Sequence, residues 1–409
     1  MATNKNDFIK QFTYDRYLGK KDIGFRIPND LSLNETWQDI LNFRKQRSLS
    51  FSFEDQSQHA FWYLLTPALQ KKIYEIDSNG KDSLYSMVKK DIEHELVRDS
   101  LIEESLYSSV IEGAFSTIKR LRELVEEKKK PRDINDQMVL NNHKAMQFIF
   151  EAKHEKLSIP FILKLHKLVT DKTLDVEDQE FTGRFRNGPV YIKDKRDRVI
   201  YTPPPAKTVP GSMEKLVDWV NEEEEAAFIH PIIKASFIHF YLVYVHPFFD
   251  GNGRTARALF YYYLIKHGYD FFKYFSISVV VQKTKAQYYK AIKDVEDYEA
   301  DLTYFLLYMA DTIGESIEQV KNRIIHRYHR DLVFGRLKEK GIFINSRQEK
   351  FLRKFLIRDV AVMTIQDYQK IHSVVYETAR RDLEDLVERG ILLKSKHRRK
   401  FFFRPNYDF

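Results

Sequence analysis

The residues best suited to chemistry lie in one run from His246 to Arg257, which reads His-Pro-Phe-Phe-Asp-Gly-Asn-Gly-Arg-Thr-Ala-Arg. Gly251 and Gly253 allow a tight turn whose amide N–H groups can converge on an anion. A helix that begins near Arg254 would add the positive end of its dipole. These residue types and spacings predict a phosphate-binding loop between two helices.

The side chains of this run have distinct chemical capacities. Arg254 and Arg257 share one face of the helix, so both guanidinium groups can hold phosphate oxygens in a forked geometry. Asp250 offers a hard oxygen ligand beside the phosphates, which suits Mg²⁺. His246 can take up a proton near neutral pH. The sequence therefore predicts a base, a metal ligand and two phosphate-binding cations in one site.

The run resembles the signature of the Fic family, His-x-Phe-x-Asp/Glu-Gly-Asn-Gly-Arg-x-x-Arg, at every specified position. The resemblance implies a protein adenylyltransferase, which uses ATP and Mg²⁺ and moves AMP to a Ser, Thr or Tyr hydroxyl of a target protein. It implies that His246 is the general base, that Asp250 holds Mg²⁺, and that Arg254 and Arg257 hold the β- and γ-phosphates. The nucleotide-binding residues so implied are Gly251, Asn252, Gly253, Arg254, Thr255, Ala256 and Arg257. Kinase-like members carry a lysine where this chain has Gly253, so the glycine favours AMP transfer.

A second motif lies upstream, at the end of a helix that apolar periodicity predicts for residues 91–113. Ser108, Glu112 and Gly113 match the inhibitory motif of the same family, Ser/Thr-x-x-x-Glu-Gly/Asn. The resemblance implies that Glu112 pairs with Arg257, so that ATP binds in a pose unsuited to transfer. As a bare pattern the motif is common, and a solvent-exposed helix end is the alternative interpretation.

Residues 183–205 differ from the helical segments around them. Val190, Tyr191 and Ile192 form one short β-type run and residues 199–201 another, on either side of a charged turn. The position resembles the flap of the Fic family, which would hold a target segment as an added strand; the alternative is a plain surface hairpin. Tyr288 and Tyr289 fall where the family closes its adenine pocket, although two tyrosines at helix spacing also suit core packing.

The last residues, 344–409, are predicted to form a separate unit. Helices over 347–358 and 364–372, a longer helix over 376–389 and two strands around a basic turn at 395–399 resemble a winged helix. Arg380, Arg381 and the cations of the turn could contact DNA phosphates. Winged helices also bind proteins and form dimers, so both interpretations stay open.

The composition fits a mainly α-helical protein in several parts. The chain has 409 residues and no cysteine, and the lack of cysteine excludes disulfides and thiol catalysis. Its formal net charge of +8 permits an acidic partner without requiring one. The N-terminus lacks the apolar core of a signal peptide, so a cytoplasmic protein without a membrane span is expected.

The predicted architecture is a Fic-type helical core with a β-hairpin flap, followed by a small winged-helix domain of mixed α and β structure. Its parts are an N-terminal helical segment packed on the core (1–90), the Fic domain (91–313), a connecting helix (314–343) and the winged helix (344–409).

Two further functions stay open. The chain could be a DNA-binding regulator in which the Fic core senses a nucleotide, or its site could remove AMP with Glu112 positioning a water. Self-modification and a homo-oligomer are also compatible with the sequence.

Overall fold

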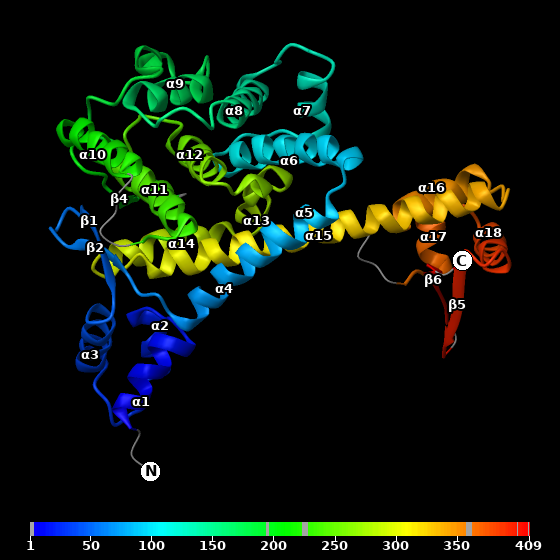
Figure 1. The fold of residues 1–409 in the computed structure, drawn as a ribbon, viewed down its shortest axis with the longest axis horizontal. Coiled ribbons are helices and arrows are strands. Elements are labelled where there is room, and N and C mark those ends of the chain that lie inside the picture. The colour runs from blue at the N-terminus through cyan, green and yellow to red at the C-terminus, as the bar shows by residue number, and fades with distance from the viewer. Residues whose placement is uncertain (1–3, 194–195, 223–227, 357–361, 399, 408) are drawn as a thin grey trace. The chain divides into compact units, whose positions relative to one another are not determined.

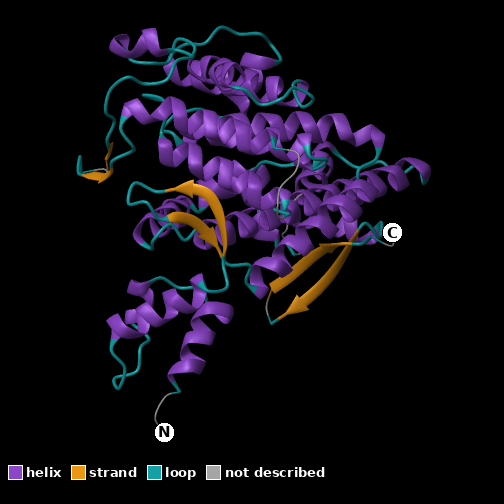
Figure 2. Cartoon of the chain, turned by 60° about the vertical axis from the view of Figure 1, so that its left-hand side comes forward, coloured by secondary structure: helices purple, strands orange, loops and turns teal. Residues whose placement is uncertain are grey.

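The computed structural model describes residues 4–409 except 194–195, 223–227, 357–361, 399 and 408. It divides into two compact units, Met1–Ile317 and Glu318–Phe409, and the boundary lies inside one helix, α15. The protein is mainly helical, as predicted, and its strands form separate two-stranded antiparallel hairpins within the described ranges (Figure 2).

The first unit contains most of the helices (Figure 1). Its elements before residue 90 are α1 (Lys5–Lys10), the π-helix η1 (Gln11–Asp15), α2 (Lys20–Gly24), α3 (Leu33–Lys45), β1 (Leu49–Glu54), β2 (Ala60–Tyr63), α4 (Pro67–Asp77), the π-helix η2 (Ser78–Leu84) and α5 (Tyr85–Met87). The following elements are α6 (Lys90–Ile111), α7 (Ile118–Val125), α8 (Ile134–Glu151), α9 (Ile159–Thr170), the 3₁₀ helix η3 (Val176–Phe181), β3 (Ile192–Lys193), β4 (Val199–Tyr201), the 3₁₀ helix η4 (Ala206–Thr208) and α10 (Val209–Asn221). The last are α11 (Pro231–Val245), α12 (Asn252–Lys266), the 3₁₀ helix η5 (Asp270–Tyr274), α13 (Ile277–Lys283), α14 (Lys285–Asp297) and the first part of α15 (Thr303–Glu339).

The core of this unit is built around α11 and α12, which pack against each other. Both helices are buried on all sides, including the polar residues Ser236, His239 and Thr255. A helix that is apolar around its whole circumference must be covered by neighbours, and α6, α8 and α9 supply this cover to α12. The loop between α11 and α12 is thereby held between two buried helices.

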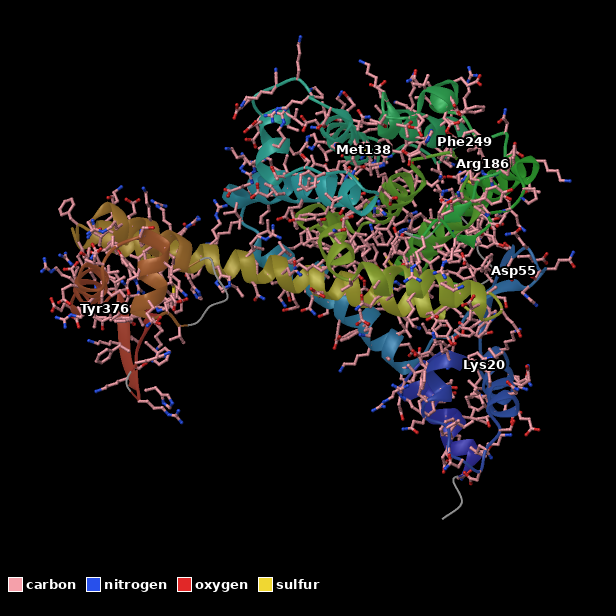
Figure 3. All side chains as sticks on the ribbon, turned by 180° about the vertical axis from the view of Figure 1, so that it is seen from behind. Lys20, Asp55, Met138, Arg186, Phe249 and Tyr376 are labelled. Atoms are coloured by element: carbon pink, nitrogen blue, oxygen red, sulfur yellow. The ribbon has the colours of Figure 1, made fainter. Side chains whose placement is uncertain are left out.

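The N-terminal residues include a β-hairpin that the sequence analysis did not predict. Strands β1 and β2 pair antiparallel, with Leu49 opposite Tyr63, and Phe51 stacks on Phe237 of α11 with ring centroids 4.2 Å apart. Figure 3 marks the tip of this hairpin at Asp55. The predicted N-terminal helical segment, 1–90, therefore also contains a hairpin, and this hairpin packs on α11 of the core.

The short hairpin β3–β4 lies where the flap was predicted, with Ile192 opposite Tyr201. The predicted first strand, 190–192, is wrong in its bounds, because β3 begins only at Ile192. The predicted charged turn includes residues 194–195, which lie outside the described residues.

One helix, α15, replaces two predicted segments, since it covers the predicted end of the Fic domain and most of the predicted connecting helix. The second unit continues with α16 (Ser346–Phe355), α17 (Ile365–His372), α18 (Tyr376–Glu388), β5 (Leu392–His397) and β6 (Lys400–Pro405). A single antiparallel bridge joins Met363 to Phe403, so a third chain segment pairs with the hairpin. Phe351, Tyr368, Leu383 and Phe403 are fully buried in the core of this unit.

Across the described part of the chain, no helix is both long enough and apolar enough to cross a membrane.

Candidate active site

The loop between α11 and α12 has a backbone conformation that its sequence explains. His246 ends α11 in the left-handed region, with φ 51° and ψ 58°, and Gly251 precedes α12 with φ 82°. A Cβ atom at Gly251 would lie 2.7 Å from Cγ2 of Thr170, so only glycine fits there. The Asn252 side chain accepts a hydrogen bond from the Phe248 amide (3.0 Å) and donates to the Phe248 carbonyl (2.8 Å), which closes the loop.

A buried histidine from α9 anchors the same loop. The imidazole of His166 stacks on Phe248 with ring centroids 3.6 Å apart and an interplanar angle of 3°. Its Nδ1 accepts from the Gly183 amide, so Nε2 carries the proton and donates to the Asp250 carbonyl at 2.9 Å. Burial lowers the pKa of His166 to about 4, which keeps the ring neutral. No motif of the sequence marks this histidine, and in the structure its contacts hold the loop in position.

His246 is held ready to accept a proton. Its Nδ1 lies 3.2 Å from the Val243 carbonyl, an acceptor, so Nδ1 carries the hydrogen and Nε2 keeps its lone pair. Burial lowers the pKa of His246 to about 4, against smaller opposing effects of the Val243 carbonyl and Glu112. The imidazole is therefore neutral at physiological pH, as a general base must be before reaction.

Arg254 and Asp250 form an ion pair at the start of α12. Nη2 of the fully buried Arg254 donates to Oδ2 of Asp250 at 2.8 Å, and its Nη1 donates to the Val169 carbonyl. The Asp250 side chain is about half exposed (51%). Its second carboxylate oxygen has no hydrogen bond within the described residues and is open to a ligand.

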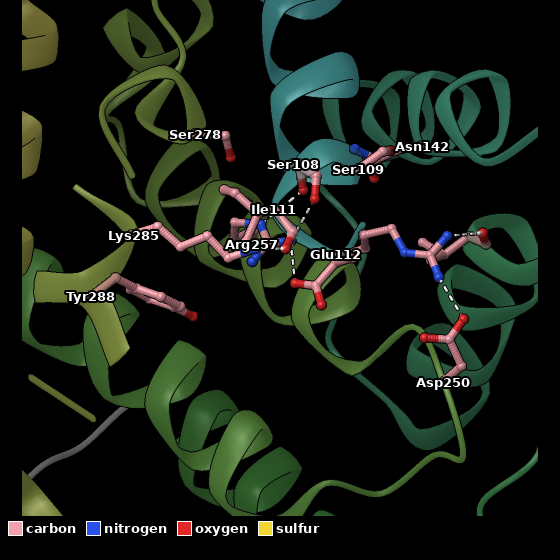
Figure 4. A network of polar contacts seen from close by, with 12 residues as sticks. Ser108, Ser109, Ile111, Glu112, Asn142, Asp250, Arg257, Ser278, Lys285 and Tyr288 are labelled. Atoms are coloured by element: carbon pink, nitrogen blue, oxygen red, sulfur yellow. Dashed lines mark hydrogen bonds and ion pairs between the residues drawn. The ribbon is translucent and has the colours of Figure 1, made fainter. Parts of the chain in front are cut away.

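Arg257 is occupied by the upstream helix α6 (Figure 4). Its Nε donates to Oγ of Ser108, and its Nη2 donates to the Ser108 carbonyl and to Oε1 of Glu112, all at 2.8 Å. Burial opposes the charge of this guanidinium, but Glu112, Tyr288 and Glu104 together outweigh that effect and the pKa of Arg257 is raised. Nη1 of Arg257 is buried without a partner in the described chain. The two predicted motifs, 108–113 and 246–257, are thus in direct contact, and Nη1 of Arg257 stays unpaired within the described chain.

Two glycines make this meeting possible. Gly113 has φ 102° and ends the helix directly after Glu112. A side chain at Gly253 would overlap the Glu112 carboxylate, so the loop accepts this carboxylate only because residue 253 is glycine.

The remaining residues of the predicted nucleotide-binding run have buried side chains. Thr255 and Ala256 are both 0% exposed, so only their backbone is placed to contribute at the first turn of α12. Of the predicted flap residues, Tyr191 is exposed (54%), Val190 is partly exposed and outside the strand, and Ile192 faces the cavity described next.

A cavity of about 460 Å³ opens beside His246. Its lining residues are Glu112, Ile192, Ile200, Tyr201, Val243, His246, Gly253, Tyr288, Tyr289, Lys290, Ile292, Lys293 and Glu296. Tyr288, which was also predicted to pack in the core, donates or accepts a hydrogen bond with Nε2 of His239 at 2.9 Å. The cavity is thus bounded by the β3–β4 hairpin, by α14 and by Glu112, and its volume is in the range of small-molecule sites.

Arg186 supports the site and was missed in the sequence. It is 3% exposed, and its guanidinium donates to backbone carbonyls of His246 (2.7 Å), Gly188 (2.8 Å) and Pro204 (2.5 Å). Its amide donates to the Pro247 carbonyl, which places it close to the loop near Phe249 (Figure 3). The only signal in the sequence was its place between Gly183 and the flap, which does not tell a buried arginine from an exposed one.

The sequence and the fold of this region are similar to those of known proteins. Residues 156–264 match the sequence model of the Fic/DOC family. This stretch contains His246 and the loop between α11 and α12, so this part of the chain is similar to a Fic domain.

Relatives with the same domain carry the name of an enzyme. The chain is 29% identical over 222 residues to protein adenylyltransferase Fic of Drosophila willistoni, covering 53% of this chain and 41% of that protein. It is 27% identical over 264 residues to protein adenylyltransferase fic-1 of Caenorhabditis elegans, covering 62% and 48%. The chain therefore spans less than half the length of these relatives.

Solved structures share the fold. A Fic family protein from Desulfovibrio desulfuricans superposes with a TM-score of 0.54 at 19% identity, covering 84% of this chain and 97% of that one. A fragment of Fic-1 from C. elegans superposes with a TM-score of 0.51 at 24% identity, covering 66% and 73%.

Proposed function

We propose that this protein is an adenylyltransferase that moves AMP from ATP to a Ser, Thr or Tyr hydroxyl of a target protein, and that Glu112 inhibits it. The observation that carries the proposal is the pairing of Glu112 and Ser108 with Arg257 beside a neutral His246. The names of the relatives agree with this activity.

In the proposed reaction the target hydroxyl attacks the α-phosphorus of ATP. Nε2 of His246 takes the hydroxyl proton as the new P–O bond forms. The bond from the α-phosphorus to the bridging oxygen breaks, and pyrophosphate leaves with the electron pair. Amide groups at the start of α12, with Arg254 and Arg257, hold the phosphates and stabilise the developing charge.

The residues present fit a magnesium ion. Mg²⁺ in nucleotide sites is held by one or two carboxylates together with substrate phosphates and water, and Asp250 presents one oxygen without a protein partner beside the loop. The described residues hold no cluster of three or more metal-ligating side chains, so substrate oxygens would complete the coordination. When bound, the ion would neutralise charge on the phosphates.

The proposed inhibition follows from the geometry of Arg257. A guanidinium that already donates to Glu112 and Ser108 has only Nη1 left for a γ-phosphate. ATP would then bind with its phosphates displaced from the line of attack, which lowers the rate because transfer depends on positioning.

The flap is proposed to hold the target. Strand β3 pairs only with β4 in the described chain, so its other edge is open to an extended segment. Exposed Tyr191 and Val199 would contact the side chains of that segment.

The test of the catalytic proposal uses α-labelled ATP, Mg²⁺ and cell lysate as a source of targets. We expect His246→Ala to abolish protein labelling while nucleotide binding and the thermal midpoint stay near wild type. His154→Ala, which changes an exposed histidine outside the site, is the matched control. Labelling that persists in His246→Ala would contradict the assignment of the base.

The same assay tests the proposed inhibition by Glu112. We expect Glu112→Gly to raise labelling by at least tenfold, because Arg257 regains its donors for the γ-phosphate. Glu127→Gly makes the same change in an exposed segment and should have no effect. Equal labelling by Glu112→Gly and wild type would show that Glu112 does not inhibit transfer.

A second candidate function belongs to the unit from Glu318 to Phe409. Arg381 and the cations of the β5–β6 turn, Lys396, Arg398 and Lys400, are exposed, which supports a winged helix that binds DNA phosphates. Arg380 supports it less, because it is paired with Glu377 and Glu384. A salt-dependent DNA affinity that is lost on removal of residues 344–409 would support this function, and its absence would contradict it.

A further inference from the structure

The cavity beside His246 contains a carboxyl group that the proposed reaction does not use. Glu296 lines this cavity together with Tyr289 on the same helix, α14. Seven residues of helix separate the two, or about 10 Å along the axis. Burial and then the charge of Glu112 raise the pKa of Tyr289, so Tyr289 lies at the end of the cavity near the phosphate-binding loop. Glu296 lies at the opposite end.

Glu296 also lines a smaller neighbouring cavity of about 160 Å³. The tip of the β1–β2 hairpin forms part of that wall, where the Gln56 amide donates to the Tyr244 hydroxyl at 2.7 Å. Tyr201 lines both cavities, as Glu296 does. The carboxyl group therefore stands at a junction enclosed by the flap, α11, α14 and the N-terminal hairpin.

Within the described residues the Glu296 carboxyl has no hydrogen bond and no ion pair. The nearest cation on its helix, Lys293, donates instead to Asp297 at 2.9 Å. Burial raises the pKa of Glu296 to about 8, with Lys293 lowering it and Asp297 raising it by smaller effects. At neutral pH this group is a protonated carboxylic acid without a protein partner.

The groups that face Glu296 from other elements do not supply a compensating charge. Burial raises the pKa values of Tyr201 on β4 and Tyr244 on α11, so both hydroxyls stay neutral. Asp55, in the hairpin tip, is held by the amides of Ser57 and His59, each at 2.8 Å. A ligand is therefore the remaining hydrogen-bond partner for Glu296.

We propose that Glu296 determines the nucleotide specificity of this cavity by recognising the edge of the adenine base with its carboxyl group. This inference rests on the proposed use of ATP. A protonated carboxyl donates one hydrogen bond and accepts one, which matches the adenine N1 acceptor and N6 amino donor. An ionised carboxylate only accepts, so it opposes adenine N1 and fits guanine, whose N1 and N2 both donate.

The test measures the dissociation constants of MgATP and MgGTP by calorimetry on the full chain at pH 6.5 and pH 9. The protonated fraction of a group with pKa about 8 falls roughly tenfold over this interval and its ionised fraction rises roughly thirtyfold, so the preference for ATP over GTP should fall at least tenfold. Glu296→Gln keeps one donor and one acceptor at every pH, so its ATP preference should stay constant. Glu214→Gln, which changes an exposed glutamate of α10, should behave as wild type.

The possible results are distinct. The same pH-dependent ratio in Glu296→Gln and wild type, or a wild-type ratio that does not change with pH, would overturn the assignment of Glu296. Binding of neither nucleotide would overturn the proposed function and this inference with it. Nucleotide binding with the expected ratios but without protein labelling would leave the role of Glu296 standing and contradict the transferase.

Discussion

Arg186 holds the backbone around His246 in place, although it has no part in the proposed chemistry. Its donors join the carbonyl of His246 to both stems of the flap, at Gly188 and Pro204. His246 is in the left-handed conformation, which a non-glycine residue keeps only when its surroundings hold it there. The position of the base therefore depends on a buried cation.

We expect Arg186→Ala to lower AMP transfer at least a hundredfold and to reduce the free energy of unfolding by about 3 kcal/mol, because several buried carbonyls lose their donor. Arg184→Ala is the control, since Arg184 is exposed two residues away. Labelling assays and urea denaturation measure the two effects. Transfer in Arg186→Ala that stays within a few-fold of Arg184→Ala would exclude a positioning role.

Residues of the site differ in how far the sequence predicts them. The run 246–257 could be predicted because a tight turn, a helix start and a charged ligand impose local requirements on neighbouring residues. His166 and Arg186 act on the same loop from 84 and 60 positions away. No local pattern distinguishes them from ordinary core or surface residues, so only the fold reveals their role.

At the scale of elements, the proposed inhibition depends on α6. Glu104, one helical turn before Ser108, is buried and accepts hydrogen bonds from the Tyr261 hydroxyl (2.9 Å) and from Ser276 and Ser278 (2.7 and 2.5 Å). These bonds join α6 to α12 and to the start of α13. They fix the position of α6 relative to α12, and therefore how closely Glu112 approaches the loop.

We expect Glu104→Ala to reduce the free energy of unfolding by roughly 3 kcal/mol, because several buried donors lose their acceptor. The same change should raise transfer above wild type, since α6 no longer holds Glu112 firmly against Arg257. Glu112→Gly should raise transfer while Glu104 keeps its bonds to Tyr261, Ser276 and Ser278, so the two variants separate direct release of Arg257 from loosening of α6. Wild-type activity in a destabilised but folded Glu104→Ala would limit Glu104 to a structural role.

The predicted helices were confirmed where apolar residues recur at helical spacing over many residues. The expected helix 91–113 is α6, Lys90–Ile111, and the expected helix 376–389 is α18, Tyr376–Glu388. The hairpin β1–β2 was missed, although Phe51 and Phe53 alternate with polar residues as in a half-buried strand. Short alternation also suits irregular structure, and the aromatic rings of α11 that stabilise this hairpin are far away in the sequence.

At the scale of the whole molecule, the two units have separate cores, and the assignment of 344–409 as a winged helix stays a prediction. Its helices and hairpin occur in the predicted order, and the bridge from Met363 to Phe403 was not predicted. Whether a single residue such as Met363 forms a bridge depends on the position of a strand that is distant in the sequence. The sequence could therefore predict the elements of this unit but not how they pair.

Buried neutral histidines should make the stability of the folded chain depend on pH. Burial lowers the pKa values of His143 and His166 to about 4 and that of His239 to about 3, whereas histidines in an unfolded chain titrate near 6.5. The unfolded chain therefore binds more protons between pH 6.5 and pH 4, and the free energy of unfolding falls as the pH drops through this window.

Between pH 6.5 and pH 5 the loss is roughly 2 kcal/mol for each fully buried histidine, which should appear as a lower urea midpoint at pH 5. We expect His143→Gln to lose less stability over this interval than wild type, because one buried titrating group is gone. His154→Gln removes an exposed histidine and should keep the wild-type dependence. If all three proteins lost stability equally, the acid sensitivity would have to come from groups other than His143, and its neutral burial in the folded chain would be wrong.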